Sequence, residues 1–104
     1  MIKVSVMYPS GADTTFDLDY YKNSHLPMIS AALGDALKGM ELTVGLAGRA
    51  PGEEAPYTVI VDLKFDTMES FQASFFPHAE TFAADIPNYT NVKGELQISE
   101  IVSL

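Results

Sequence analysis

Hydrophobic and polar residues alternate in four segments of the chain, and a period of two is typical of β-strands with one buried face. We expect these strands over residues 2–8, 38–47, 57–65 and 92–102. The third segment contains the nearly continuous β-branched run Thr58-Val59-Ile60-Val61, which favours a central place in a sheet. Residues 48–56, which are rich in Gly and Pro, predict an exposed loop between the second and third strands.

A helical spacing of three to four residues follows the first strand. We expect a helix from about Asp17, a good N-cap, to Leu33, with Gly34 as the C-cap. Pro27 lacks a backbone N–H and disfavours helical backbone at Leu26, so the helix should kink or restart there.

A second helical segment follows the third strand. Asp66 with Glu69 three residues later resembles a capping box, which predicts that this helix begins at Asp66. Pro77 should interrupt it much as Pro27 interrupts the first helix. The hydrophobic pattern then resumes as far as Ile86.

The expected order of elements is strand, helix, strand, strand, helix, strand. Two β-α-β units of this kind predict an α+β, ferredoxin-like fold with a four-stranded antiparallel sheet and both helices on one face. Residues 1–104 then form a single domain. We expect the other sheet face to be apolar as well, with Met7 and Ile101 on it, and an uncovered apolar face does not stay in water. A homodimer through the opposed sheet faces, a dimeric α/β barrel, is therefore predicted.

Composition narrows the possible partners. Six basic and fourteen acidic side chains give the 104-residue chain a net charge of −8, which argues against nucleic acids and anionic membrane surfaces as partners. The chain has no cysteine, so disulfides, thiolate nucleophiles and cysteine metal sites are excluded. The sequence shows neither a leader-like start nor a membrane-spanning run, and we expect a cytoplasmic protein without membrane contact.

His25 is the strongly polar member of the inward stripe of the first helix, whose other members are Leu18, Tyr21, Met28 or Ile29, and Ala32. An imidazole titrates near neutral pH and suits a general base or acid. Burying it without a partner would cost about 1–3 kcal/mol, so either a polar partner or a cavity is expected beside it. The alternative is a core histidine with satisfied hydrogen bonds and no chemistry.

Several segments together resemble one known family. They are Ile2-Lys3-Val4-Ser5-Val6, Phe16-Asp17-Leu18-Asp19-Tyr20-Tyr21 with His25-Leu26-Pro27, Phe71-Gln72 before Pro77-His78-Ala79, Ile86-Pro87-Asn88-Tyr89-Thr90-Asn91, and Gln97-Ile98-Ser99-Glu100. Over essentially its whole length the chain resembles the EthD family of the dimeric α/β-barrel superfamily. The resemblance implies a mostly apolar pocket between helices and sheet, with His or Tyr as its polar group.

This resemblance suggests His25 and Tyr21 as catalytic residues, and Tyr20, Tyr8, His78 and Tyr89 as substrate-binding residues. Tyr20 and Tyr21 are adjacent, so they cannot both face inward from one helix. His78 mirrors His25 in the second β-α-β unit, but a surface or capping histidine is an open alternative. Tyr89 could rim the pocket or simply pack as a plug.

Two functions remain open. The first is a cofactor-independent enzyme of isomerase, dehydratase/cyclase or monooxygenase-like type, acting in catabolism on a small apolar, aromatic or lactone-like metabolite. The second is a non-catalytic dimer that binds such molecules or serves as an accessory subunit.

No cofactor and no metal are expected. Two histidines without cysteine fall short of a three-ligand zinc site unless carboxylates join them, and no dinucleotide or P-loop motif is present. Haem held by His25 is the alternative, since some relatives use an axial histidine, but no second haem feature accompanies it.

Overall fold

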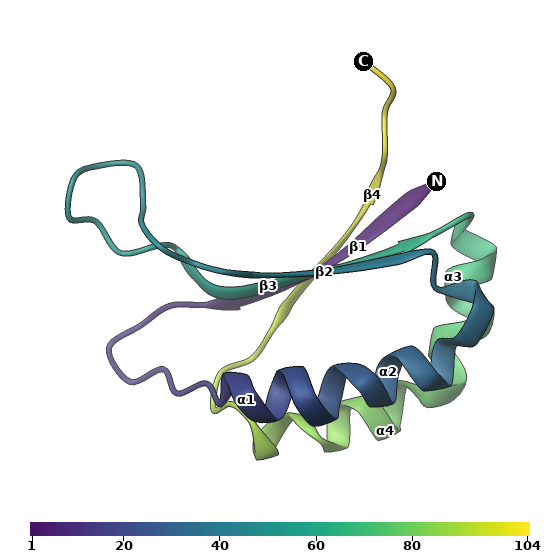
Figure 1. The fold of residues 1–104 in the computed structure, drawn as a ribbon, viewed down its shortest axis with the longest axis horizontal. Helices are drawn as coiled ribbons and strands as arrows, with labels where there is room; N and C mark the ends of the chain where they lie inside the picture. Colours follow the sequence, from purple (N-terminus) through teal and green to yellow (C-terminus); the bar gives the residue numbers. More distant parts are fainter.

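The computed structural model describes every residue from Met1 to Leu104 and contains one four-stranded sheet with helices on one face (Figure 1). All strand pairs are antiparallel, and the strands stand in the order β2-β3-β1-β4. Their bounds are Ile2–Pro9 for β1, Gly39–Val44 for β2, Tyr57–Phe65 for β3 and Glu95–Glu100 for β4. With one helical segment after β1 and another after β3, this is the ferredoxin-like α+β arrangement predicted from the sequence.

Strands β2 and β4 are shorter than the predicted segments 38–47 and 92–102. At its N-terminal end β4 begins only at Glu95, opposite Met7, although β1 continues to Pro9. The backbone N–H of Gly45 donates the last hydrogen bond between β2 and β3, to the carbonyl of Thr58. Pro56, just before β3, has no N–H with which to continue the pairing. Likewise, β4 cannot extend past the start of β1, and the chain leaves the sheet after Ile101 bonds to Met1.

The first helical segment consists of α1 (Leu18–Tyr20), the π-helical turn η1 (Tyr21–His25) and α2 (Leu26–Leu33). Asp17 caps it as predicted, since its carboxylate accepts a bond from the Tyr20 N–H. The interruption expected near Pro27 takes the form of η1, in which the Leu26 N–H bonds to the Tyr21 carbonyl five residues back. Gly34 ends α2 as the predicted C-cap, with a positive φ of 57°.

The second helical segment is built from α3 (Met68–Phe75), the 3₁₀ turn η3 (Phe76–His78), α4 (Ala79–Ala84) and the 3₁₀ turn η4 (Ile86–Asn88). Pro77 lies in η3, so the predicted interruption is confirmed. The predicted cap at Asp66 is wrong. Thr67 is the N-cap, because its hydroxyl accepts a bond of 3.0 Å from the Ser70 N–H.

Replacing Thr67 with Ala is expected to lower the free energy of unfolding by about 1 kcal/mol, the usual cost of a lost N-cap. Urea unfolding measures this difference. Asp66→Ala is the matched control and should change stability less, since the Asp66 carboxylate lies only in a long, exposed ion pair of 3.9 Å with Lys38. A larger loss of stability for Asp66→Ala than for Thr67→Ala would show that Asp66 is the N-cap, as the sequence suggested.

The hydrophobic core lies between the sheet and the helices. Its fully buried strand residues are Val4, Val59, Val61, Leu63 and Phe65. They share one sheet face, because Val4 pairs with Leu63 and the others alternate along β3. From the helices, Phe71 and Phe82 close this core.

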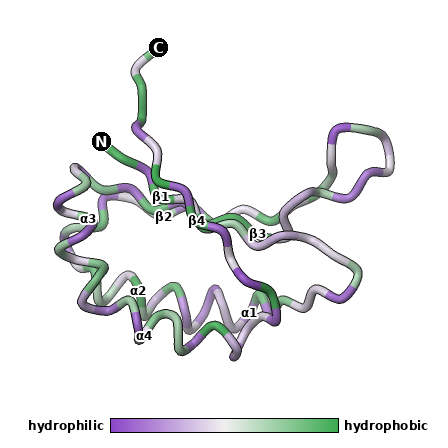
Figure 2. Tube along the Cα trace, turned by 180° about the vertical axis from the view of Figure 1, so that it is seen from behind, coloured by the Kyte–Doolittle hydropathy of each residue, from purple (hydrophilic) through white to green (hydrophobic).

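The opposite sheet face is mostly polar, and the expectation of an apolar outer face is wrong. Along the strands, hydrophilic residues recur between hydrophobic ones (Figure 2). The residues that face away from the helices are Lys3, Ser5, Met7, Glu41, Thr43, Thr58, Ile60, Asp62, Lys64, Glu95, Gln97 and Ser99. The Ser5 hydroxyl donates to the Asp62 carboxylate across this face. Only Met7 and Ile60, which pair directly, form an apolar spot, so this face gives less support to the predicted homodimer than expected.

Two extended segments leave the body of the protein. The β2–β3 loop projects beyond one end of the sheet, and the last residues of the chain extend away from the side that carries the helices (Figure 1). Ile101, Val102 and Leu104 in this tail are exposed. None of the helices combines the length and the apolar character needed to cross a bilayer.

Candidate functional site

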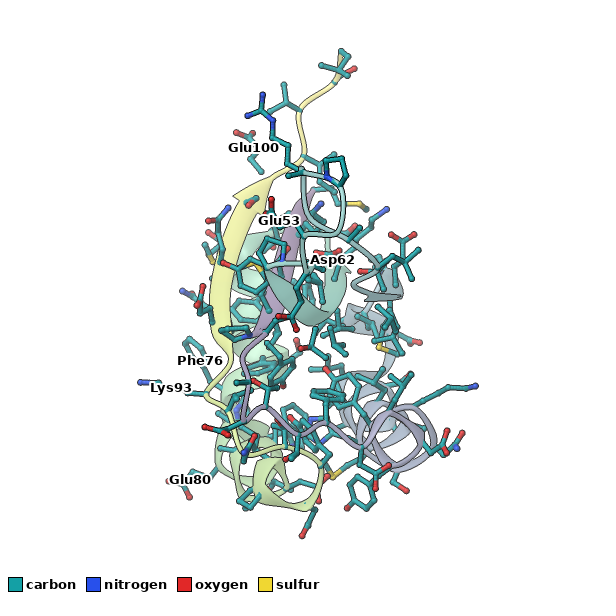
Figure 3. All side chains as sticks on the ribbon, turned by 90° about the vertical axis from the view of Figure 1, so that its left-hand side faces the viewer. Glu53, Asp62, Phe76, Glu80, Lys93 and Glu100 are labelled. Carbon is teal, nitrogen blue, oxygen red and sulfur yellow. The ribbon has the colours of Figure 1, made fainter.

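A cavity of about 500 Å³ lies between the sheet and the two helical segments. Most of its walls are hydrophobic, and the polar side chains that line it are Tyr8, Tyr21, His25, Tyr89 and Lys93. Leu96 and Lys93 also line it and are exposed, so the cavity opens along the β4 edge of the sheet. The side chain of Lys93 extends outward at this edge (Figure 3). The volume and the apolar lining suit a small organic molecule.

His25 ends the π-helical turn η1 and lies at the wall of the cavity, with only 3% of its surface exposed. Tyr21, at the start of the same turn, stacks on its ring at a centroid distance of 5.3 Å and an angle of 15°. Tyr89 packs against the ring from the second half of the chain, at 4.6 Å. The imidazole is therefore fixed by aromatic rings of two separate segments.

The two ring nitrogens of His25 differ in their surroundings. Nδ1 lies 2.8 Å from the carboxylate oxygen Oδ2 of Asp85. An ionised carboxylate only accepts hydrogen bonds, so Nδ1 carries the proton and Nε2 is the bare nitrogen of the neutral ring.

Nε2 makes no hydrogen bond to the chain, although His25 is buried. Every side-chain nitrogen or oxygen that is fully buried has a hydrogen-bond partner. Since Nε2 has none, it is not fully buried and borders open space. Because His25 lines the cavity, that space is the cavity. The site thus presents a hydrogen-bond acceptor and potential base to a molecule bound between apolar walls.

Asp85 is the functional residue that sequence reasoning missed. Besides His25, it accepts hydrogen bonds from the Tyr20 hydroxyl at 2.7 Å and from the Asn88 side-chain amide at 2.8 Å. Partial burial by itself raises the pKa of Asp85, but the hydrogen bonds from Tyr20, Asn88 and His25 outweigh burial and lower it below the usual value. The carboxylate therefore stays ionised and keeps its bond to Nδ1.

One signal in the sequence could have pointed to Asp85. It is the residue at the C-terminal end of α4, where the helix macrodipole disfavours negative charge. A carboxylate at such a position therefore suggests a specific interaction that stabilises it. Here three hydrogen-bond donors stabilise the Asp85 carboxylate.

Three buried tyrosines, Tyr8, Tyr21 and Tyr89, pack against one another at the cavity wall. The hydroxyls of Tyr8 and Tyr89 lie 2.7 Å apart. Burial, followed by the neighbouring Tyr8, raises the pKa values of Tyr21 and Tyr89 far above their usual range. Burial also raises the pKa of Tyr8, but hydrogen bonds to Tyr89 and Tyr21 partly offset the shift. All three hydroxyls are consequently neutral at physiological pH.

Spectrophotometric titration of the tyrosines should show that Tyr8, Tyr21 and Tyr89 resist ionisation until the protein unfolds. Their pKa values are raised on folding, so the stability they contribute is present below the unfolded value of about 10 and is lost as the pH rises through the folded values. Phenolate absorbance and circular dichroism should therefore change together. Ionisation of all tyrosines near pH 10 with the fold intact would contradict the buried group.

The structure brings four of the six predicted site residues together at the cavity: Tyr8, Tyr21, His25 and Tyr89. Tyr20 does not line the cavity, and its hydroxyl instead holds Asp85. His78 also lies outside it, half-buried and stacked on Phe82 at 5.8 Å. No cluster of three His, Asp or Glu side chains is arranged to hold a metal ion.

No protein-family model and no curated protein matches the chain, but solved structures do. An EthD-like protein from Ralstonia eutropha JMP134 is 39% identical, with a TM-score of 0.93 over 98% of this chain and 92% of that chain. An EthD family protein from Bacillus halodurans C-125 is 20% identical, with a TM-score of 0.67 over 98% of this chain and 99% of that chain.

HapK from Hahella chejuensis is 13% identical, with a TM-score of 0.53 over 98% of this chain and 94% of that chain. At such low identity, HapK and the Bacillus halodurans protein show only that the fold is shared. The Ralstonia protein is similar enough in sequence, over nearly the whole of both chains, to show the family as well as the fold. The chain therefore belongs to the EthD family.

Proposed function

We propose that this protein binds a small apolar molecule, aromatic or lactone-like, in the cavity and transfers a proton to or from it with His25, in the degradative metabolism of the cytoplasm. The observation that carries the proposal is the unpaired Nε2 of His25, which faces an apolar cavity while Nδ1 is tied to Asp85. A general base needs this arrangement, namely a free lone pair within reach of the substrate.

Asp85 supports proton transfer through His25. When Nε2 takes a proton, the ring becomes an imidazolium, and the adjacent carboxylate stabilises its charge. The lowered pKa of Asp85, to which Tyr20 and Asn88 contribute, keeps the Nδ1 proton on the ring. Tyr20 and Asn88 are therefore positioning residues that act on His25 through Asp85.

The walls of the cavity support the choice of ligand. Side chains such as Val6, Ile29 and Phe75 offer dispersion and burial but no hydrogen bonds. The name of the Bacillus halodurans family member contains ethyl tert-butyl ether, itself a small apolar compound. Chemistry by His25 needs no cofactor when it consists of proton transfer, as in an isomerase or a dehydratase. The same apolar walls would serve a non-catalytic binding protein, which is the second candidate.

Binding of N-phenyl-1-naphthylamine, a neutral fluorescent probe, tests the ligand site. We expect Ala79→Phe to weaken binding at least about tenfold, because Ala79 lines the cavity and a phenyl ring there would occupy it. Ala84→Phe is the matched control, since Ala84 is an exposed residue of the same helix outside the cavity. Equal affinities for both variants would show that the probe binds elsewhere and would remove the basis of the proposal.

We also propose a homodimer through the outer sheet faces. The helices leave this face uncovered, Met7 and Ile60 pair on it, and the exposed hydrophobic tail residues Ile101 and Val102 lie beyond its end. Because the rest of the face is polar, ion pairs and hydrogen bonds should supply much of the specificity. Sedimentation velocity at micromolar concentration should give the mass of two chains, and a single chain there would contradict the dimer.

A further inference from the structure

We propose that the hydroxyl of Tyr8 is a catalytic hydrogen-bond donor that stabilises an oxyanion on the bound molecule, and that the substrate is therefore an enolisable carbonyl compound. This inference rests on the proposed function, because it assigns the second polar group that a proton transfer by His25 requires. Removing a proton next to a carbonyl group leaves negative charge on the carbonyl oxygen, and an apolar cavity without a donor would strongly disfavour that charge.

Tyr8 is distinguished from the two tyrosines beside it. Its hydroxyl lies 2.7 Å from that of Tyr89, and a pair of hydroxyls uses only one of its two protons in the bond between them. Tyr89 and Tyr21 both pack against the His25 ring, whereas the ring of Tyr8 packs against these two tyrosines and Phe16. Tyr8 therefore meets a bound molecule away from the His25 ring, and we assign the remaining hydroxyl proton of the Tyr8–Tyr89 pair to Tyr8.

The Tyr8 side chain is held rigidly, as a donor to a developing charge should be. Its ring packs edge-on against Phe16 at 5.1 Å and against Tyr21 at 5.8 Å. On another side, the backbone of Gly94 lies so close that a Cβ atom there would come within 3.0 Å of the Tyr8 ring. With 3% of its surface exposed, Tyr8 cannot be replaced as a donor by bulk water.

Tyr8 and His25 line the same cavity and are connected through shared neighbours. Tyr89 contacts the His25 ring at 4.6 Å and the Tyr8 ring at 5.9 Å, while Tyr21 stacks on His25 and packs edge-on against Tyr8. A molecule in the cavity thus meets a bare nitrogen and a free hydroxyl proton between apolar walls. These two groups suit the C–H bond and the oxygen of one carbonyl compound.

The proposed step conserves atoms and electrons. The bond between the α-carbon and its hydrogen breaks, and the proton forms a bond to Nε2 of His25. The released electron pair forms the carbon–carbon double bond of an enolate, and the carbonyl π electrons move onto oxygen, which accepts a hydrogen bond from Tyr8. Return of the proton to the same carbon regenerates the substrate, and delivery to a conjugated carbon gives an isomer, so no oxidant or reductant is consumed.

Hydrogen–deuterium exchange of 2-tetralone in heavy water, followed by proton NMR, measures this step directly. We expect the wild-type protein to accelerate exchange at the α-carbons, and Tyr8→Phe to lower that acceleration by about 10²–10³-fold, as for the loss of an oxyanion donor. Tyr89→Phe, which removes a bond to Tyr8 and leaves Tyr8 in place, should lower it by a smaller factor. Tyr57→Phe is the matched control, since Tyr57 bonds to Glu95 away from the cavity.

Binding of 2-naphthol, an aromatic enol, separates the two proposals. The wild-type protein should lower the apparent pKa of the bound naphthol relative to the Tyr8→Phe variant, because Tyr8 favours the naphtholate oxygen. If His25→Gln abolishes 2-tetralone exchange while Tyr8→Phe leaves both exchange and naphthol ionisation unchanged, this inference is overturned and the proposed function stands. If the wild-type protein neither binds 2-naphthol nor accelerates exchange, both proposals fail.

Discussion

Replacing His25 with Gln is expected to reduce proton transfer in the cavity by about two to four orders of magnitude, the usual contribution of a positioned general base. Glutamine keeps a similar size and polarity and can still donate a hydrogen bond to Asp85, so the fold and the cavity should persist. It has no group that accepts and releases a proton near neutral pH. The acceleration of α-proton exchange in 2-tetralone measures the loss, and binding of N-phenyl-1-naphthylamine reports whether the cavity survives.

His78→Gln is the matched control for this experiment. His78 lies outside the cavity, stacked on Phe82, and its replacement should leave both exchange and binding unchanged. If His25→Gln alters only the affinity of the probe and wild-type exchange is no faster than in buffer, the protein is a binding module and the enzymatic proposal is wrong.

Replacing Asp85 with Asn should have the second large effect, because it changes the state of His25 without touching the imidazole. The Asn amide can donate a hydrogen bond to Nδ1, which favours the tautomer with the proton on Nε2. The nitrogen that faces the cavity would then no longer be a base. We expect α-proton exchange to fall by about 10²-fold or more, as expected when a catalytic histidine is held in the wrong tautomer.

The same substitution should lower the free energy of unfolding by about 1–3 kcal/mol at neutral pH, because charge-assisted hydrogen bonds to a partly buried carboxylate are lost. The pKa of Asp85 is lowered on folding, so its contribution to stability is present above the unfolded value of about 3.9 and is lost as the pH falls through the folded value.

Urea unfolding across acid pH measures this dependence. The difference between the wild type and Asp85→Asn should shrink as the pH falls below about 4. Glu80→Gln serves as a control on the same helix, since Glu80 is exposed at the surface (Figure 3). A difference between wild type and Asp85→Asn that is constant down to pH 2 would show that the charge of Asp85 is not involved.

The strand periods and helix boundaries could be read from the sequence where local chemistry decides them. Asp17 and Gly34 cap the first helical segment as predicted, because capping depends on residues within one turn. The stripe of apolar residues also placed Tyr21 and His25 on the inward face. At these positions, local interactions along the sequence favour the same conformation as the tertiary fold.

Features that depend on distant segments were not available from the periodicity. Asp85 reaches His25 across 60 residues, and only the packing of the two helical segments brings them to 2.8 Å. The polarity of the outer sheet face was predicted wrongly. Alternation within one strand shows which of its residues share a face, but it does not show which residues of another strand lie beside them. The β1–β3 register places the polar residues Ser5 and Asp62 side by side on this face. Tyr20 was expected to bind substrate, yet its adjacency to the inward Tyr21 turns it toward Asp85.

The state of the His25 ring tests the account most directly, through long-range nitrogen–proton correlation NMR on protein labelled with ¹⁵N-histidine. His78→Gln leaves His25 as the only histidine and thus assigns its signals. At a pH where the ring is neutral, Nδ1 should carry the proton and Nε2 should be bare, and addition of 2-naphthol should shift the Nε2 signal. A proton on Nε2 in the free protein, or an Nε2 signal that ignores a bound ligand, would contradict the role of His25 as the base of this cavity.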